Sequence, residues 1–285
     1  MQDRLVDSPG ISVPAEAVTA VAPRRRPRVS KRRLRSWGVQ LASLLAFLGA
    51  WQWVGSHTNP ILLATPGAVV AAFFDMIAKG QLQAGFLIAT EDLATGYVLA
   101  IVVGVGVGLL MGRSLLIEQV LNPYVNFMQA TPLVALVPLI VIWFGIEFKA
   151  RVTVVFVLAV WSVIINTSTG VKTTPRVLID VARVYHLTER KVMREIALPS
   201  AVPHIFAGLR IALGKALIGM VIAEMEVSIV GLGGLLSDYG NSFKTAYLMA
   251  GIFTASLVGV ITAIFLEWCL ARFFPWVAAT SAQRD

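Results

Sequence analysis

Few side chains in this sequence have the type and spacing that enzyme chemistry requires. The three histidines, His57, His186 and His204, are scattered along the chain, so they cannot supply the clustered metal ligands of a membrane-embedded enzyme. Cys269 is the only cysteine, which excludes an internal disulfide framework and a metal site built from several thiolates. We therefore expect a chain that is not an enzyme, with no catalytic residue and no bound metal.

Two glycine-containing stretches could suggest nucleotide binding, and neither fits. Gly104, Gly108 and Gly112 lie in an apolar run that lacks the preceding strand of a dinucleotide-binding unit. Gly214-Lys215 is not a P-loop, because alanine follows where Ser or Thr is needed. Glycine at every fourth position instead predicts a helix face that another helix approaches closely. We expect no cofactor on this chain, so the energy source must lie on another polypeptide.

Ionisable residues inside apolar runs are the next candidates, since they usually face a protein interior or a water-filled cavity. Lys215 and Glu224 are nine positions apart, about 13–14 Å along a helix, which is too far for a direct pair. Lys215 either snorkels or pairs with another span, or it lines a path for anions. Glu91, Asp92, Glu224 and Glu226 could be the ion sites of a secondary transporter, although no convincing internal repeat accompanies them.

Prolines interrupt the apolar run at 120–146, at Pro123, Pro132 and Pro138. A broken helix frees backbone groups, which are tolerated only where protein or water satisfies them. We therefore expect this run to border a translocation pathway. Polar residues in the spans more often form interhelical hydrogen bonds than contact a substrate. The pathway candidates are Gln129, Thr131, Asn166, Lys215 and Glu224.

Composition shows what must position these residues. Of the 285 residues, 57% are hydrophobic and 14% are charged, whereas soluble proteins carry about 25% charged residues. Runs of about 20 apolar residues can span a membrane as helices. The sequence therefore predicts an all-α integral membrane protein with six transmembrane helices. The predicted spans are residues 37–55, 83–112, 120–146, 152–171, 203–225 and 245–266, with a short amphipathic stretch before Lys79.

Basic residues predict the orientation of these spans. Eight of them lie between Arg24 and Arg35, just before the first span, and six more lie in the loop after the fourth span. Cytoplasmic loops are enriched in Lys and Arg, so both termini are expected inside. The net charge of +8 thus reflects membrane topology and does not indicate nucleic acid. We expect residues 1–36 to be a disordered basic cytoplasmic tail, with a cleaved signal peptide as the alternative, and residues 277–285 to be a C-terminal cytoplasmic tail.

The loop at 172–199 is too charged for lipid and rich in helix formers. We expect two short amphipathic helices, with Thr188 as the N-cap of the second and Pro199 ending the run before span five. Such a pair could be a membrane-surface element or a docking site for a soluble partner, and the residues alone favour neither.

This loop resembles the cytoplasmic signature of ABC importer permeases: Glu-Ala-Ala, three residues, Gly, nine residues, then Ile-x-Leu-Pro. Here Asp180-Val181-Ala182 fills the first triplet, and Ile196, Leu198 and Pro199 match its end at the same spacing. The segments QATPLVALVPLIVIWFGI (129–146), PHIFAGLRIALGKALIGMVIAEM (203–225) and GLGGLLSDYG (231–240) are similar to the permeases of the nitrate, sulfonate and taurine importer group. The resemblance covers roughly residues 40–275.

The resemblance implies a type I ABC importer permease (MetI-like) fold over residues 37–276, with 172–199 as its coupling-helix loop. It implies a homodimer in the bacterial inner membrane, two ATP-binding subunits that bind ATP and Mg, and a solute-binding protein outside. The cargo would be a small solute, expected to be an anion such as a sulfonate, taurine, nitrate or aromatic carboxylate. The residues implied in docking the ATP-binding subunit are Asp180, Val181, Ala182, Arg183, Tyr185, His186, Leu187, Thr188 and Glu189.

Val181 and His186 depart from the signature. His186 stands where the family has Gly, at the expected bend between the two short helices, where φ is often positive. Histidine tolerates that region better than most residues, so docking should survive. We expect His186 to lie at the subunit contact.

Overall fold

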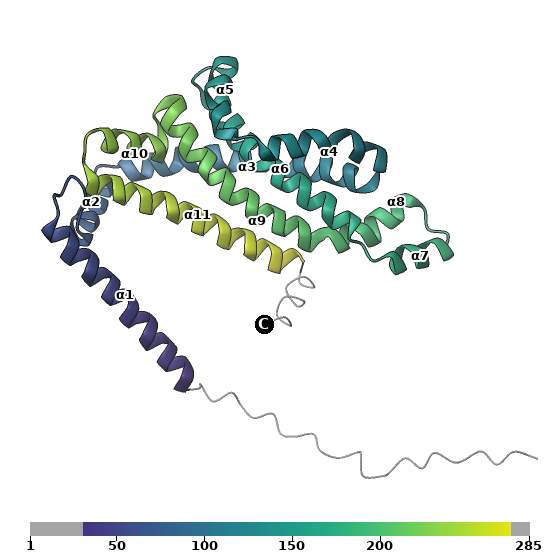
Figure 1. The fold of residues 1–285 in the computed structure, drawn as a ribbon, viewed down its shortest axis with the longest axis horizontal. Coiled ribbons are helices and arrows are strands. Elements are labelled where there is room, and N and C mark those ends of the chain that lie inside the picture. Colours follow the sequence, from purple (N-terminus) through teal and green to yellow (C-terminus); the bar gives the residue numbers. More distant parts are fainter. Residues whose placement is uncertain (1–30, 275–285) are drawn as a thin grey trace, which may run out of the picture. The chain divides into compact units, whose positions relative to one another are not determined.

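The computed structural model describes residues 31–274 (Figure 1). Ala50 onward forms one compact unit, and residues 31–49, the first part of helix α1, belong to a separate one. The expected C-terminal tail lies outside the described residues, as does the expected N-terminal tail up to residue 30. Helix α1 begins at Lys31, within the basic block and six residues before the expected start of the span at 37.

All regular structure in residues 31–274 is helical. The helices are α1 (Lys31–His57), α2 (Pro66–Ala78), α3 (Gln81–Arg113), α4 (Leu115–Ala130), α5 (Val137–Phe144), α6 (Phe148–Lys172), α7 (Arg176–Val184), α8 (Glu189–Val192), α9 (Leu198–Ala223), α10 (Gly231–Asn241) and α11 (Thr245–Phe273). Leu133–Leu136 is a 3₁₀ turn, and Met193–Ala197 and Glu224–Ser228 are π-helical turns.

The described residues contain four or five candidate membrane spans. Helices α3, α6, α11 and the helix that contains α9 are each long and apolar enough to cross a membrane, and the bent pair formed by residues 115–130 and 133–144 is a fifth candidate. Helix α1, 27 residues long, covers the first of the six expected spans.

Helices α3, α6 and α9 form the core of the compact unit, with α6 packed against α3 and against α9. The predicted glycine face is confirmed. A Cβ added at Gly104, Gly108 or Gly112 would lie 2.6 Å from the Cβ of Val163, Thr167 or Val171 on α6, whereas at Gly106 it would meet nothing within 4 Å. Glycine therefore lets α3 approach α6 along several turns.

The third span is broken, as the prolines predict. Its two parts are bent by 93°, and Thr131, between them, is extended with φ −74° and ψ 137°. Pro132 follows, and the residue before a proline is disfavoured in the helical region. Pro123, by contrast, lies inside α4 without ending it.

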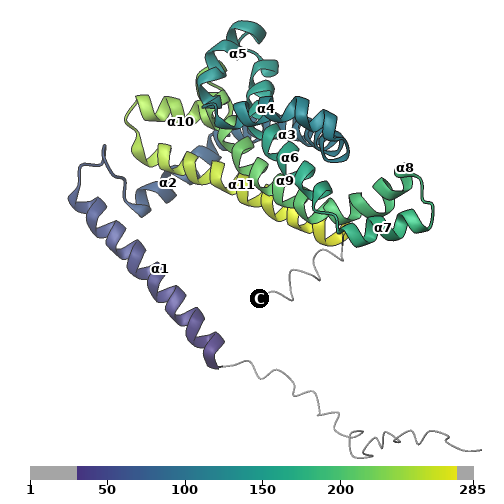
Figure 2. The same cartoon turned by 45° about the vertical axis from the view of Figure 1, so that its right-hand side comes forward.

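Two expectations in this region need correction. Pro199 does not end a helix before span five, because α8, the π turn and α9 form one helix, Glu189–Val227, of 39 residues. Pro199 lies in the first turn of α9, where its missing N–H is tolerated next to the π turn. The stretch expected to be a loop between spans five and six contains α10, which packs on α3 and α11 (Figure 2).

Candidate functional site

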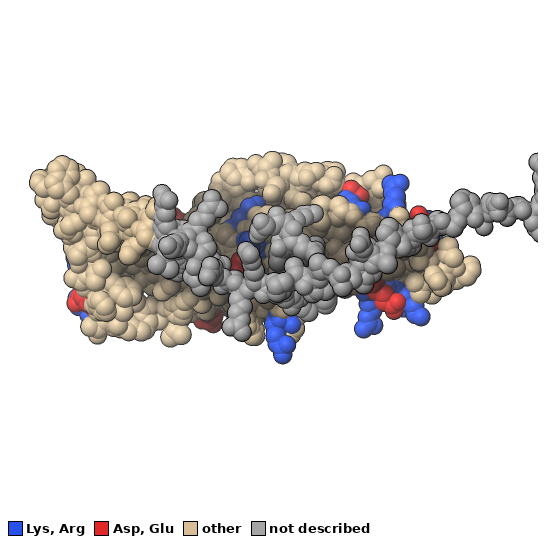
Figure 3. Space-filling model, turned by 90° about the horizontal axis from the view of Figure 1, so that it is seen from below, with Lys and Arg blue, Asp and Glu red and all other residues tan. Residues whose placement is uncertain are grey.

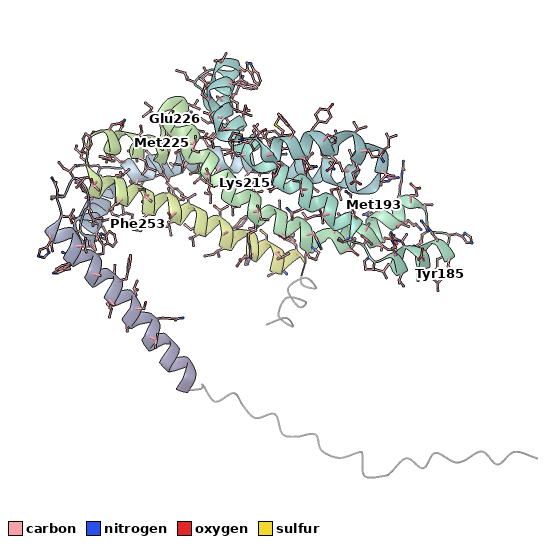
Figure 4. All side chains as sticks on the ribbon, in the orientation of Figure 1. Tyr185, Met193, Lys215, Met225, Glu226 and Phe253 are labelled. Atoms are coloured by element: carbon pink, nitrogen blue, oxygen red, sulfur yellow. The ribbon has the colours of Figure 1, made fainter. Side chains whose placement is uncertain are left out.

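Helix α7 exposes an apolar stripe. Val177, Leu178, Val181, Val184 and Tyr185 fall on one side of the helix at helical spacing, and Val184 and Tyr185 are 75% and 76% exposed. Ala182, on the other side, is buried. Several charged side chains gather toward the same end of the chain (Figure 3), with Tyr185 at the tip of α7 (Figure 4). An exposed apolar stripe among charged residues is typical of a surface that contacts another protein or the membrane.

The bend after α7 has a left-handed backbone at His186, as expected at the position where the family signature has Gly. His186 has φ 53°, its N–H donates to the carbonyl of Arg183, and the N–H of Leu187 donates to the carbonyl of Ala182. These two bonds form a Schellman motif, with His186 at the left-handed position that glycine usually fills. The exposed imidazole therefore sits at the turn between α7 and α8.

The rest of the loop is held by its helix ends and by ion pairs. Thr188 is the N-cap of α8, as predicted, and its extended backbone starts the helix without a side-chain hydrogen bond. Glu189 accepts from Arg113 at the end of α3, at 3.0 Å, and Arg183 lies 3.4 Å from Asp180. The first ion pair joins the start of α8 to a core helix, so the loop is fixed to α3 as well as to α9.

Two pathway candidates lie together at the break of the third span. Lys215 Nζ, on α9, donates to Gln129 Oε1 near the end of α4, at 3.4 Å. Thr131 follows as the C-cap of α4, and its hydroxyl donates to the carbonyl of Phe127. The structure thus brings Gln129 and Lys215 into contact and places Thr131 at the bend beside them.

The other two candidates lie elsewhere. Asn166 donates to the carbonyl of Ser162, one turn back on α6, and its Cβ faces Gly208 of α9. Glu224 is fully buried, and its Oε2 accepts from the backbone N–H of Gly233 at 2.6 Å. The Glu224 carboxyl group thus accepts from an N–H at the N-terminal end of α10, which has no partner within that helix. A Cβ at Gly231 or Gly233 would collide with the Glu224 side chain, which explains the glycine-rich start of α10.

Sequence reasoning missed the ion pairs between helices, two of which join membrane-spanning helices of the core. Asp92 on α3 accepts from Arg151 on α6 at 2.6 Å, with Asp92 fully buried and Arg151 12% exposed. Arg210 on α9 pairs with Glu267 on α11. The only signal in the sequence was an acid and a base in different spans, 59 and 57 positions apart, which does not identify partners.

A polar cluster lies at the end opposite α7. Asp75 of α2 accepts from Lys79 at 2.5 Å and from the Tyr247 hydroxyl at 3.0 Å, and Tyr239 stacks on Tyr247. The hydrogen bond from Lys79 holds the pKa of Asp75 below its usual value. The same bond raises the pKa of Lys79. This cluster joins α2 and α10 to the first turn of α11.

The four acids considered as ion sites do not form one site. Arg151 neutralises Asp92, Glu224 is bound by α10, and Glu91 and Glu226 are exposed. In the described part of the chain, no three His, Cys, Asp or Glu side chains are grouped so that they could hold a metal ion.

Comparison with known proteins extends this picture. Residues 96–278 match the model of the family "Binding-protein-dependent transport system inner membrane component". The SsuC permease protein of Bacillus subtilis (strain 168), named for aliphatic sulfonate transport, is 29% identical over 259 residues, covering 90% of this chain and 93% of the relative. The nitrate import permease protein NrtB of Leptolyngbya laminosa is 31% identical over 242 residues, covering 82% and 86%.

The fold is also that of a solved importer. A chain of the MetNI methionine ABC transporter, in an inward-facing conformation, matches with a TM-score of 0.56 at 16% identity, covering 70% of this chain and 97% of that one. The matched family model, the relatives and the helical architecture agree. The chain therefore belongs to the family of binding-protein-dependent inner-membrane transport components, as a non-catalytic, multi-pass permease subunit of an ABC importer.

Proposed function

We propose that this permease imports a small anion as a homodimer, driven by two ATP-binding subunits that dock on the stripe of α7 and supply the ATP and Mg. Permeases of this family work with ATP-binding subunits and a solute-binding protein. The main support for this proposal is the exposed stripe on α7. An apolar surface beside basic residues is more stable when it is buried in a groove of a soluble partner than when it faces water.

The orientation follows from the same assignment. A docking loop for a soluble ATPase must be cytoplasmic, which agrees with its basic residues and places both termini inside. The α2–α10 end then faces outward, where the solute-binding protein would deliver its cargo. The anion class rests on the relatives, which are named for sulfonate and nitrate transport.

The bent third span supports pairing of two copies. Where α4 and α5 meet at 93°, backbone groups leave the helical pattern, and such groups are tolerated at membrane depth only beside protein or water. A second copy facing this bend would enclose a path that one copy leaves open. ATP-driven closure of the ATPase pair would then move the docking loops and switch the path between two states.

The docking assignment is tested by Val184→Asp in the tagged permease, co-expressed with its ATP-binding subunit. The buried charge should abolish co-purification and nucleotide-dependent ATP hydrolysis. Lys191→Asp, on the neighbouring exposed turn, is the control. It changes the charge of the loop by two, so a purely electrostatic effect would be larger there. Co-purification of Val184→Asp at the wild-type level would refute docking on this stripe.

A further inference from the structure

Lys215 differs from Arg151 and Arg210, two other basic residues of the membrane-spanning helices. Arg151 pairs with Asp92, and Arg210 pairs with Glu267. Among the described residues, Lys215 has no carboxylate oxygen within ion-pair distance, and its side chain donates to the neutral amide oxygen of Gln129. Lys215 therefore carries a positive charge that this part of the chain leaves uncompensated.

Its position in the helix makes that charge significant. Lys215 lies about 15 Å along the helix from Met225 and about 26 Å from Leu198, at a rise of 1.5 Å per residue. Figure 4 shows it between Met193 and Met225, well away from both. Such distances exceed the reach of a lysine side chain, so Lys215 cannot reach either end of the span by snorkelling. An unpaired ammonium at this depth must face water or protein rather than lipid.

Gln129 brings a second suitable group to the same place. It lies two residues before Thr131, where the third span bends, and broken spans border protein or a water-filled cavity. The Gln129 carbonyl oxygen is used by Lys215, which leaves the two amide N–H groups free to donate. The ammonium retains further N–H donors. The unused capacity of the pair therefore consists of donors and a positive charge, which is complementary to an oxyanion.

We propose that Lys215 and Gln129 form an anion-binding station on the translocation path, which takes a small oxyanion such as nitrate or a sulfonate. The inference rests on the proposed function, since it needs a path between two copies. The ammonium compensates the charge of the anion as it leaves water, and the amide orients an oxygen. Binding through one cation and one amide is weak enough to release the anion onward. Neutral solutes gain no compensation there, so the station selects for charge.

The test uses the complete importer, with its ATP-binding subunits and solute-binding protein, in proteoliposomes. Uptake of labelled nitrate and of labelled ethanesulfonate is measured beside ATP hydrolysis stimulated by the binding protein. Lys215→Met should lower uptake at least tenfold while retaining stimulated hydrolysis, and Lys215→Arg should restore most of it. Gln129→Leu should give an intermediate loss. Ile218→Met, an exposed position one turn along α9, should leave both readouts unchanged.

Each outcome separates the station from the importer. Wild-type uptake by Lys215→Met would overturn the station and leave the importer standing. Stimulated hydrolysis with import of neither anion by the wild type would overturn the anion class and the station with it. Failure of any ATP-binding subunit to co-purify with the wild type would overturn the proposed function itself.

Discussion

Replacing Gly104 by alanine should loosen the contact between α3 and α6, whereas the same change at Gly106 should not. The added Cβ at Gly104 would lie 2.6 Å from Val163 Cβ and 3.2 Å from the Val160 carbonyl oxygen. Ordinary contact begins at 3.4 Å, so the shortfall is 3.4 − 2.6 = 0.8 Å. Val163 Cβ is attached to the backbone and cannot rotate away, so the helices must separate.

The two variants can be compared quantitatively. Overpacking a close contact costs about 1–3 kcal/mol, whereas alanine for glycine in an open helix position gains up to about 1 kcal/mol. The gain in helix propensity is common to both variants, so they should differ in stability by the overpacking cost of about 1–3 kcal/mol. At about 2–4 °C per kcal/mol for a chain of this size, Gly104→Ala should melt several degrees below Gly106→Ala.

Thermal unfolding of the detergent-purified permease measures this difference. The pair is well matched, because both changes lie on α3 half a turn apart and add the same methyl group. Melting temperatures within a degree of each other for the two single variants would refute the packing argument.

Three further predictions concern the polar contacts. His186→Gly should keep ATPase coupling and stabilise the loop by about 1 kcal/mol, whereas His186→Val should destabilise the loop, because φ is 53° at this position. Coupled ATP hydrolysis and limited proteolysis of the loop measure these effects. Loss of coupling in the glycine variant would assign a role to the imidazole. Asp92→Asn should cost about 3–5 kcal/mol, because it removes the negative charge of the Asp92–Arg151 ion pair. Asp92→Leu combined with Arg151→Leu should recover most of the melting temperature, and equal stability of Asp92→Asn and wild type would contradict the prediction. Lys79 lowers the pKa of Asp75, so the stability that ionised Asp75 contributes is fully present above its unfolded pKa, near 3.8, and is lost as pH falls through the lower folded pKa. The difference in melting temperature between wild type and Asp75→Asn should therefore be constant from pH 7 to 5 and shrink below pH 4. A constant difference down to pH 3 would be inconsistent with the ion pair.

Much of the fold could be predicted because membrane spans are recognisable from short stretches of sequence. Apolar runs of span length, the glycine face at 104–112 and the prolines before the bend are all properties of neighbouring residues. The left-handed turn at His186 was predictable from the family resemblance, because the signature has Gly at that position.

The elements that were missed depend on distant residues. Proline usually ends or kinks a helix, so Pro199 predicted a helix end. The helix continues because a π turn directly precedes the first turn of α9, where Pro199 lies. Helix α10 is rich in glycine, which disfavours helices, and it forms where Glu224 binds its first turn. The partners of Asp92 and Arg210 lie on other spans, so only the packed structure identifies them.

The continuous helix Glu189–Val227 can tilt as a rigid body about its midpoint. It is about 58 Å long, and its midpoint is Gly208, where a Cβ would lie 2.5 Å from Asn166 Cβ of α6. A pivot at this closest approach makes the two ends move in opposite directions. A tilt of about 5° displaces each end by about 2.5 Å, given the helix rise. One end adjoins the proposed docking loop and the other holds α10 through Glu224, so under this proposal a displacement of the loop would move α10 in the opposite direction.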